Sequence, residues 1–388
     1  MYEQVQSVPS VAQKFLLPED REEDSVDPGK VLFHEVAMIP VLLAEMYSVR
    51  VGSVDDVDLE ILEQLYRELE VYLVADDLRM DVYIPILGAD VSGEGDFDYF
   101  SIVRLGGEQR EILSRVGNVH PRDVRKLCQA THALLIKDAP ALAGGCGSSF
   151  EVVPYFSTFD LVDQFFDAAA LESPSLVGCA QMIFSPNGWF GNVDVAMGAN
   201  SPYLYRDYAT RLDNLTPHSG ELDYSAFTRI RGNFGGLSEG HASLRVAARR
   251  LRIARERDSD EDRIVDLCIG LESILGGGSG AGEIVHKISM RAAAILSQSG
   301  WGRSVDIFQV MKDVYSYRSR VVHGIPGPHK KELLHIDGMP IHASRYALAS
   351  LGQVLRVALA VEGFQPDKVD AMFIYPALDM AADRLSDQ

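Results

Sequence analysis

The hydrophobic periodicity of the chain changes near Leu237, and this change constrains the fold more than any other feature. Before it, segments such as 79–87 and 97–105 alternate apolar and polar residues, as half-buried strands do. After it, apolar residues recur every three or four positions, as on amphipathic helices. We therefore expect an α+β protein, with a mixed α/β domain over residues 1–225 followed by an all-α helical bundle over 226–388.

The N-terminal domain is expected to contain at least one antiparallel sheet. Its pattern predicts helices over 31–49, 57–72, 107–139 and 160–171, strands over 79–87, 97–105 and 149–156, and a hairpin from 181–184 and 192–197. The polar stretch 213–223 marks the boundary. No motif defines what this domain does, and the role we consider for it is that of a sensor or adaptor.

Composition excludes several classes of protein. The 388 residues contain no apolar run of membrane-spanning length, and the first residues lack the pattern of a signal peptide. The four cysteines are scattered, without the spacing of a zinc site or a disulfide framework. These features predict a cytoplasmic protein.

The net charge of −20 argues against a nucleic-acid partner until its distribution is considered. Residues 229–330 hold 16 Lys and Arg against 11 Asp and Glu, a local excess of +5 that leaves −25 for the rest. Association with RNA depends on the local potential rather than on the molecular sum. The sequence therefore allows an RNA partner for the C-terminal part.

A long amphipathic helix with an arginine on its apolar stripe is expected to end at Gly324. Apolar residues recur at helical spacing from 307 to 322, and Arg318 falls within them. A guanidinium on a buried face is costly unless an anion meets it. His323 follows at the helix end, where the macrodipole favours its protonated form. Together Arg318 and His323 could hold and cut a phosphodiester.

The spacing of this pair is not specific by itself. Similar Arg-to-His spacings occur elsewhere in the chain, at Arg115/His120, Arg125/His132 and Arg211/His218. From the spacing alone, a structural salt bridge and a helix-capping histidine are the better explanation of Arg318 and His323. The upstream helices supply the context that separates this pair from the others.

Three segments appear in order: RIVDLCIGLESIL (263–275), GEIVHKISMRAA (282–293) and YSYRSRVVHG (315–324). Together they resemble the Apea-like branch of the HEPN superfamily over roughly residues 240–362. This resemblance implies a dimeric α-helical bundle, with metal-independent ribonuclease activity where two Arg/His pairs meet, in bacterial defence. The chain departs from the family at Ser319, because active members often have Asn, Asp or His directly after the arginine.

These residue types suggest a mechanism that needs neither metal nor cofactor. RNA carries its own nucleophile, the 2′-hydroxyl, and His323 would act on it or on the leaving 5′-oxygen as base or acid. Arg318 would hold the non-bridging oxygens and stabilise the transition state. One chain supplies one pair, so a homodimer would supply both an acid and a base. The expected substrate is single-stranded RNA.

Other charged residues are candidates for supporting roles. Ser319 and Glu272 could support the site, with Glu272 paired to Arg318 or Arg291 because its helix neighbours are apolar. Lys287, Arg291, Arg249 and Arg252 are candidate RNA contacts, the last two on an arginine-rich helix over 242–256. The alternative for all four is a surface or structural charge.

Two further motifs have simpler explanations. The glycine-rich stretch 276–282 lacks the Lys-Ser/Thr ending of a phosphate loop and predicts a connection between helices. His329, His335 and His342, with Glu332 and Asp337 nearby, match no metal-ligand spacing.

For the chain as a whole, the alternative to a ribonuclease is a non-catalytic HEPN-like module that dimerises and binds RNA or nucleotide. Ser319 and the overall acidity favour that alternative.

Overall fold

The computed structural model divides into two compact units, each described separately below. The residues that it describes are 2–7, 12, 27, 30–31, 33–37, 39–51, 57–74, 78–114, 119–143, 152–154, 156–173, 176–186, 203–205, 207–215, 220–277, 284–324, 331–336 and 338–375. The first unit spans 1–87, 94–162 and 179–213, and the second spans 88–93, 163–178 and 214–388. The second unit therefore includes two segments that precede residue 214.

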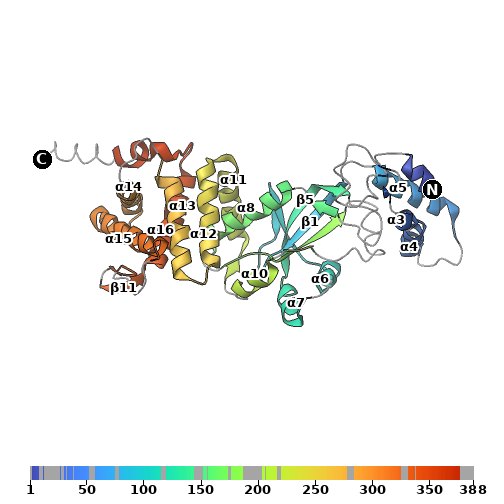
Figure 1. The fold of residues 1–388 in the computed structure, drawn as a ribbon, viewed down its shortest axis with the longest axis horizontal. Coiled ribbons are helices and arrows are strands. Elements are labelled where there is room, and N and C mark those ends of the chain that lie inside the picture. Colours follow the sequence, from blue (N-terminus) through green and yellow to red (C-terminus); the bar gives the residue numbers. More distant parts are fainter. Residues whose placement is uncertain are drawn as a thin grey trace. The chain divides into compact units, whose positions relative to one another are not determined.

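The first unit is built on an antiparallel sheet (Figure 1). Its strands are β1 (Leu78–Pro85), β3 (Gly95–Phe97), β4 (Phe100–Arg104), β5 (His132–Ala143), β6 (Val152–Pro154), β7 (Gln181–Pro186) and β8 (Tyr203–Leu204). The strand order is β3-β4-β5-β1-β7-β8, with β6 paired to β5. In β1, Met80, Val82 and Ile84 are fully buried, and this period of two places them on one face.

Helices precede and follow these strands in the first unit. They are α1 (Tyr2–Gln6), α3 (Phe33–Ala37), α4 (Ile39–Val51), α5 (Leu59–Val74), α6 (Gly107–Ser114), α7 (Pro121–Leu127), the start of α8 (Phe156–Glu172), and α10 (Tyr208–Asn214). The helix expected over 31–49 corresponds to α3 and α4, with residues 32 and 38 outside the described residues, and those expected over 57–72 and 160–171 correspond to α5 and α8 with shifted ends. Residues 149–151 and 192–197 lie outside the described residues.

The expectation of one helix over 107–139 is wrong. Helices α6 and α7 occupy its first part, but β5 begins at His132 and pairs with both β1 and β4. Residues Ala133 to Ile136 are all buried, because a strand in the middle of a sheet is covered on both faces. Such a continuous apolar run has no period of two, so periodicity could not separate it from a buried helix.

The second unit is mainly helical, which confirms the α+β class and the helical C-terminal part. Its helices are α11 (Tyr224–Glu239), α12 (Ala242–Glu256), α13 (Asp260–Leu275), α14 (Ile284–Gln298), α15 (Ser304–Val322) and α16 (Ala343–Ala360), with the short turns η4 (Pro366–Lys368) and η5 (Asp370–Ile374). Helix α13 packs against α12, α15 and α16, and α14 packs against α15.

Local sequence explains the ends of these helices. Ser259 caps α13 by accepting hydrogen bonds from the backbone N–H groups of Glu261 and Asp262. Along α13, Ile264, Leu267, Leu271 and other apolar residues at helical spacing are fully buried. Gly324 has φ 61°, a left-handed conformation that stops α15 as expected.

A short hairpin within the helical unit was not expected. Strands β10 (Leu333–Ile336) and β11 (Met339–His342) pair antiparallel, and Gly338 between them has φ 79°. The Asp337-Gly338 dipeptide is a hairpin signal that the helical periodicity on both sides obscured. The unit also contains a two-stranded parallel pair, β2 (Asp90–Val91) with β9 (Glu221–Leu222).

No helix among the described residues is both long enough and apolar enough to cross a membrane.

Candidate functional site

Arg318 and His323 lie at the C-terminal end of α15. Arg318 is half-buried, with 29% of its side chain exposed, and it faces α13. His323 is exposed and caps the helix: its backbone N–H donates to the carbonyl oxygen of Ser319 at 3.1 Å, and that of Gly324 donates to Val321 at 3.0 Å. Ser319 is exposed on the last turn. The last turn of α15 and the residue that follows it therefore present a guanidinium, a hydroxyl and an imidazole.

Glu272 of α13 is the ionic partner of Arg318. Its Oε1 lies 3.8 Å from Nη2 of Arg318, and 29% of the Glu272 side chain is exposed. The Nε of Arg318 is buried and has no hydrogen-bond partner among the described residues. At 3.8 Å the ionic contact is too long for a hydrogen bond. Arg318 thus keeps donor capacity that the described residues of the unit do not use.

The groups beneath Arg318 do not supply charge at neutral pH. Burial raises the pKa of the Cys268 thiol and of the Tyr315 hydroxyl, and the nearby Glu272 carboxylate raises both further. The Tyr315 hydroxyl donates to the carbonyl oxygen of Cys268 at 3.4 Å. Cys268 and Tyr315 are therefore neutral at pH 7, and the ion pair described there is the one between Arg318 and Glu272.

Arg291 has a structural role, which corrects its assignment as an RNA contact. It is 1% exposed, and its Nε and Nη2 donate to Asp370 at 2.7 and 2.6 Å. Its Nη1 donates to the carbonyl oxygens of Leu275, Gly277 and Pro366 at 2.6, 2.7 and 3.3 Å. A guanidinium with these five contacts holds α14, the end of α13 and the C-terminal turns together. Arg291 is therefore not the partner of Glu272.

Arg252 is also buried, and its assignment as an RNA contact is corrected for the same reason. Its side chain is 8% exposed and contacts Asp167 at 2.6 Å, Asp163 at 3.2 Å and Glu256 at 3.3 Å. Burial raises the pKa of Asp167 to about 6, although the guanidinium opposes this shift. The surrounding carboxylates raise the pKa of Arg252, so the arginine stays charged and Asp167 is the member that titrates.

The other two candidate RNA contacts differ from these arginines in exposure. Arg249 is exposed on α12, and Lys287 is half-buried on α14. Of the residues with similar Arg-to-His spacing elsewhere, His120 caps α7, where its Nδ1 accepts the backbone N–H of Arg122 at 3.2 Å. His132 is 4% exposed at the start of β5, and Arg211 pairs with Asp207 at 2.9 Å. Arg115 and His218 lie outside the described residues.

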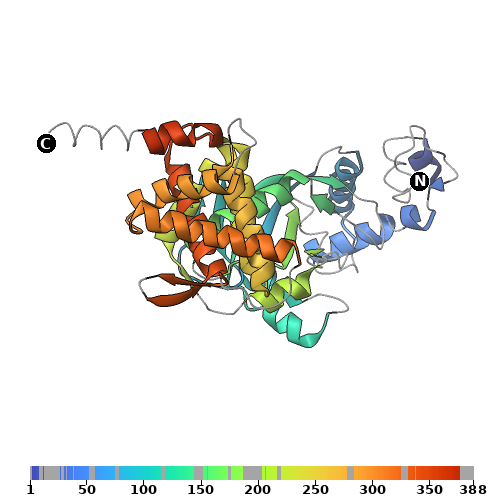
Figure 2. The same cartoon turned by 60° about the vertical axis from the view of Figure 1, so that its left-hand side comes forward.

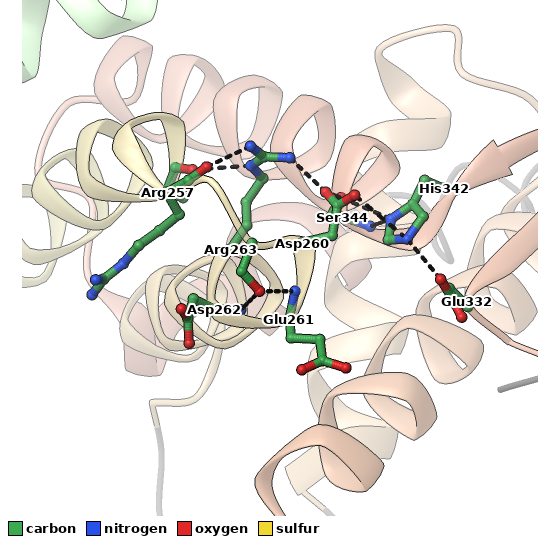
Figure 3. Close-up of polar contacts among 10 residues, drawn as sticks. Arg257, Asp260, Glu261, Asp262, Arg263, Glu332, His342 and Ser344 are labelled. Carbon is green, nitrogen blue, oxygen red and sulfur yellow. Dashed lines mark hydrogen bonds and ion pairs between the residues drawn. The ribbon is translucent and has the colours of Figure 1, made fainter. Parts of the chain in front are cut away.

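A polar network that the sequence did not predict joins the N-terminal ends of α13 and α16 (Figure 3). His342 Nε2 lies 3.5 Å from Glu332 Oε1 and 3.7 Å from Asp260 Oδ2. Ser344 Oγ and Arg263 Nη1 both donate to Asp260 Oδ1 at 2.5 Å. These contacts tie the first turn of α13 to the end of the hairpin.

The network is structural rather than catalytic. Ser344, the only hydroxyl bonded to Asp260 in Figure 3, is fully buried and cannot meet a substrate. His342 Nδ1 accepts the backbone N–H of Ser344 at 3.2 Å, which caps α16. His241 caps α12 with the same geometry at Ser243. Across the described ranges no group of His, Cys, Asp and Glu is arranged to hold a metal ion. His329 and Asp337 lie outside those ranges.

Tyr317 connects this network to α15. Its ring lies edge-on to His342, with centroids 5.8 Å apart. Burial, with the nearby carboxylates of Glu332, Glu261 and Asp260, raises the pKa of Tyr317 to about 12, so its hydroxyl stays protonated at neutral pH. The contact between Tyr317 and His342 and the one between Arg318 and Glu272 hold the last turns of α15 from two sides.

Comparisons with protein families, with curated proteins and with solved structures gave no match to this chain. The resemblance to HEPN proteins therefore depends on the sequence segments quoted above.

Proposed function

We propose that the C-terminal unit is a metal-independent endoribonuclease of the HEPN type that cuts single-stranded RNA. The main observation in support of this proposal is that the Arg318 guanidinium has few partners among the described residues. Its guanidinium is half-buried, makes one ionic contact among the described residues, at 3.8 Å, and keeps a buried Nε without a described partner, at the same helix end as an exposed histidine. A preorganised cation with unused donors is suited to a phosphodiester whose charge increases during cleavage.

The proposed mechanism uses the RNA's own nucleophile. His323 removes the proton of the 2′-hydroxyl, the 2′-oxygen attacks phosphorus, and the bond to the 5′-oxygen breaks. The His323 of a second protomer donates a proton to the leaving 5′-oxygen. The products are a 2′,3′-cyclic phosphate and a 5′-hydroxyl. Arg318 holds the non-bridging oxygens, and Glu272 orients Arg318 with the contact described above.

The active form in this proposal is a homodimer that brings two α15 ends together. It would act in the cytoplasm, and the resemblance suggests bacterial defence as its setting. The N-terminal unit would then be the sensor or adaptor that responds to a trigger. Light scattering at micromolar concentration tests the oligomeric state, and a stable monomer would contradict the shared active site.

The direct test is cleavage of a labelled single-stranded RNA with chelator present. Wild-type protein should leave cyclic phosphate ends, and His323→Ala should lose roughly 10²- to 10⁴-fold in rate because proton transfer is removed. Arg125→Gln removes an exposed arginine that precedes another histidine by a similar interval, and it should cleave normally. Cleavage that persists in His323→Ala would place the active site elsewhere.

A second function is favoured by two specific observations. Ser319 stands where active HEPN proteins often have Asn, Asp or His, and the chain as a whole carries a net charge of −20. Both favour a non-catalytic module that dimerises and binds RNA or nucleotide. The same assay separates the two functions, since such a module would retain the RNA on a filter without shortening it.

A further inference from the structure

Helices α14 and α15 form a cationic part of a strongly acidic chain. Helix α14 contains no Asp or Glu. Helix α15 contains two, Asp306 and Asp313, and they pair with Arg303 and Lys331 at 2.7 Å each. The two helices pack against each other (Figure 2). Their shared surface is thus one on which an anion meets little repulsion, although the net charge of the chain is −20.

A polar ridge follows the exposed face of α15. Lys312, Ser316, Ser319 and His323 are all exposed and succeed one another by four, three and four residues. This spacing places them on one face of the helix and its cap. Eleven residues of α-helix extend about 16 Å, at roughly 1.5 Å per residue. The ridge contains no carboxylate and ends at the proposed catalytic histidine.

An oriented ring lies beside the other end of this ridge. The imidazole of His286, exposed on α14, packs edge-to-face against the ring of Phe308, with centroids 5.1 Å apart and planes at 76°. Phe308 is half-buried, and Lys312 Nζ lies 5.6 Å from its ring centroid. The contact with Phe308 restricts the orientation of His286. A flat exposed ring and a lysine ammonium are therefore held close together.

We infer that this surface, defined by His286, Phe308, Lys312 and the ridge to His323, binds single-stranded RNA. An unpaired base stacks on the His286 ring, as bases do on aromatic and histidine side chains in single-strand readers. Lys312 binds the adjacent phosphate, and the strand continues along the ridge to His323. This inference rests on the proposed function, and it names where the substrate is held and why it is single-stranded.

The test uses an RNA that the proposed mechanism cannot cut. A fluorescein-labelled 2′-O-methyl oligouridine lacks the free 2′-hydroxyl, so its binding to full-length protein is measured by fluorescence anisotropy without cleavage. His286→Ala should weaken binding about tenfold, a typical loss for one stacked base. Lys312→Gln should weaken it and lower the salt slope by about 0.7, the value for one phosphate contact on a single strand. Both side chains are exposed, so both variants should fold.

Arg303→Gln is the matched control. It removes one positive charge from the N-terminal end of α15, where Arg303 is bound to Asp306, away from the ridge. Its affinity should equal that of wild type. Equal losses of affinity in Arg303→Gln and Lys312→Gln would show that binding depends only on the net charge, and would overturn the inference. Undiminished binding by His286→Ala, preference for a duplex, or no binding at all would also overturn it. Cleavage of unmodified RNA by wild type tests the proposed function separately from these outcomes.

Discussion

Replacing Arg291 with methionine should destabilise the C-terminal unit more than any exposed arginine replacement. The side chain of Arg291 is 1% exposed and donates to Asp370 and to three backbone carbonyl oxygens. Methionine has a similar length but no donor, so the carbonyls of Leu275 and Pro366 would remain buried without partners. Each orphaned acceptor costs about 1–3 kcal/mol.

The expected total for Arg291→Met is about 3–5 kcal/mol, the usual cost of removing one partner from a buried ion pair. This is a large part of the roughly 5–15 kcal/mol that stabilises a typical domain. The hydrogen bonds from Arg291 also lower the pKa of Asp370, so at neutral pH the substitution leaves a charged carboxylate without its partner.

The assay is urea unfolding followed by the fluorescence of Trp301, in a Trp189→Phe background. The Trp301 ring packs edge-on to Tyr346 with centroids 5.8 Å apart, so its emission reports on the C-terminal unit. Arg303→Met is the control, because Arg303 is 80% exposed and its loss should leave the midpoint unchanged. An unfolding midpoint of Arg291→Met equal to that of wild type would refute the stabilising role of Arg291.

Three further changes have defined outcomes. The pKa of Asp167 is 3.8 in the unfolded chain and about 6 in the folded protein, so the folded state binds more protons between these values. The free energy of unfolding should therefore fall as pH rises from about 4 to 6. Urea unfolding midpoints should show this fall in wild type and not in Asp167→Asn. Arg318→Lys should abolish RNA cleavage and leave the melting temperature unchanged, because a lysine ammonium cannot bind two phosphate oxygens at once as the planar guanidinium can. Retained activity would contradict this bidentate contact of Arg318 with the phosphate. Gly338→Ala should lower the free energy of unfolding by about 1 kcal/mol, because φ 79° is unfavourable for alanine. An unchanged melting temperature would argue against a left-handed conformation of residue 338 in the β10–β11 hairpin.

The helical part of the fold was predictable because its helices follow the period of 3.6. In α15, Ile307, Met311 and Val314 are buried as the pattern requires, and Gly324 ends the helix. Strand β5 was not predictable, since Ala133 to Ile136 are buried on both faces and carry no alternation. Local periodicity identifies elements with one solvent-facing side and loses information where both sides are covered.

The candidate site shows the same limit for charged residues. Arg252 lies four residues after Ala248, on the buried side of α12, and Arg291 lies between Ile288 and Ile295 on the apolar stripe of α14. Helical spacing alone could have marked both as buried. Their partners could not be found this way, because Asp167 and Asp370 are 85 and 79 residues away in sequence. The nearby sequence can therefore indicate that an arginine is buried, but the carboxylate that neutralises it is found only in the folded structure.

Comparison of these arginines explains why Arg318 remains the best candidate for a phosphate contact. Arg252 contacts three carboxylates, and Arg291 donates to one carboxylate and three carbonyl oxygens. Their guanidinium groups contribute to stability and have little left for a ligand. Among the described residues, Arg318 has one ionic contact, at 3.8 Å to Glu272, and its buried Nε has no hydrogen-bond partner. A buried donor without a partner is costly unless a ligand supplies one, and a phosphate oxygen beside His323 would do so.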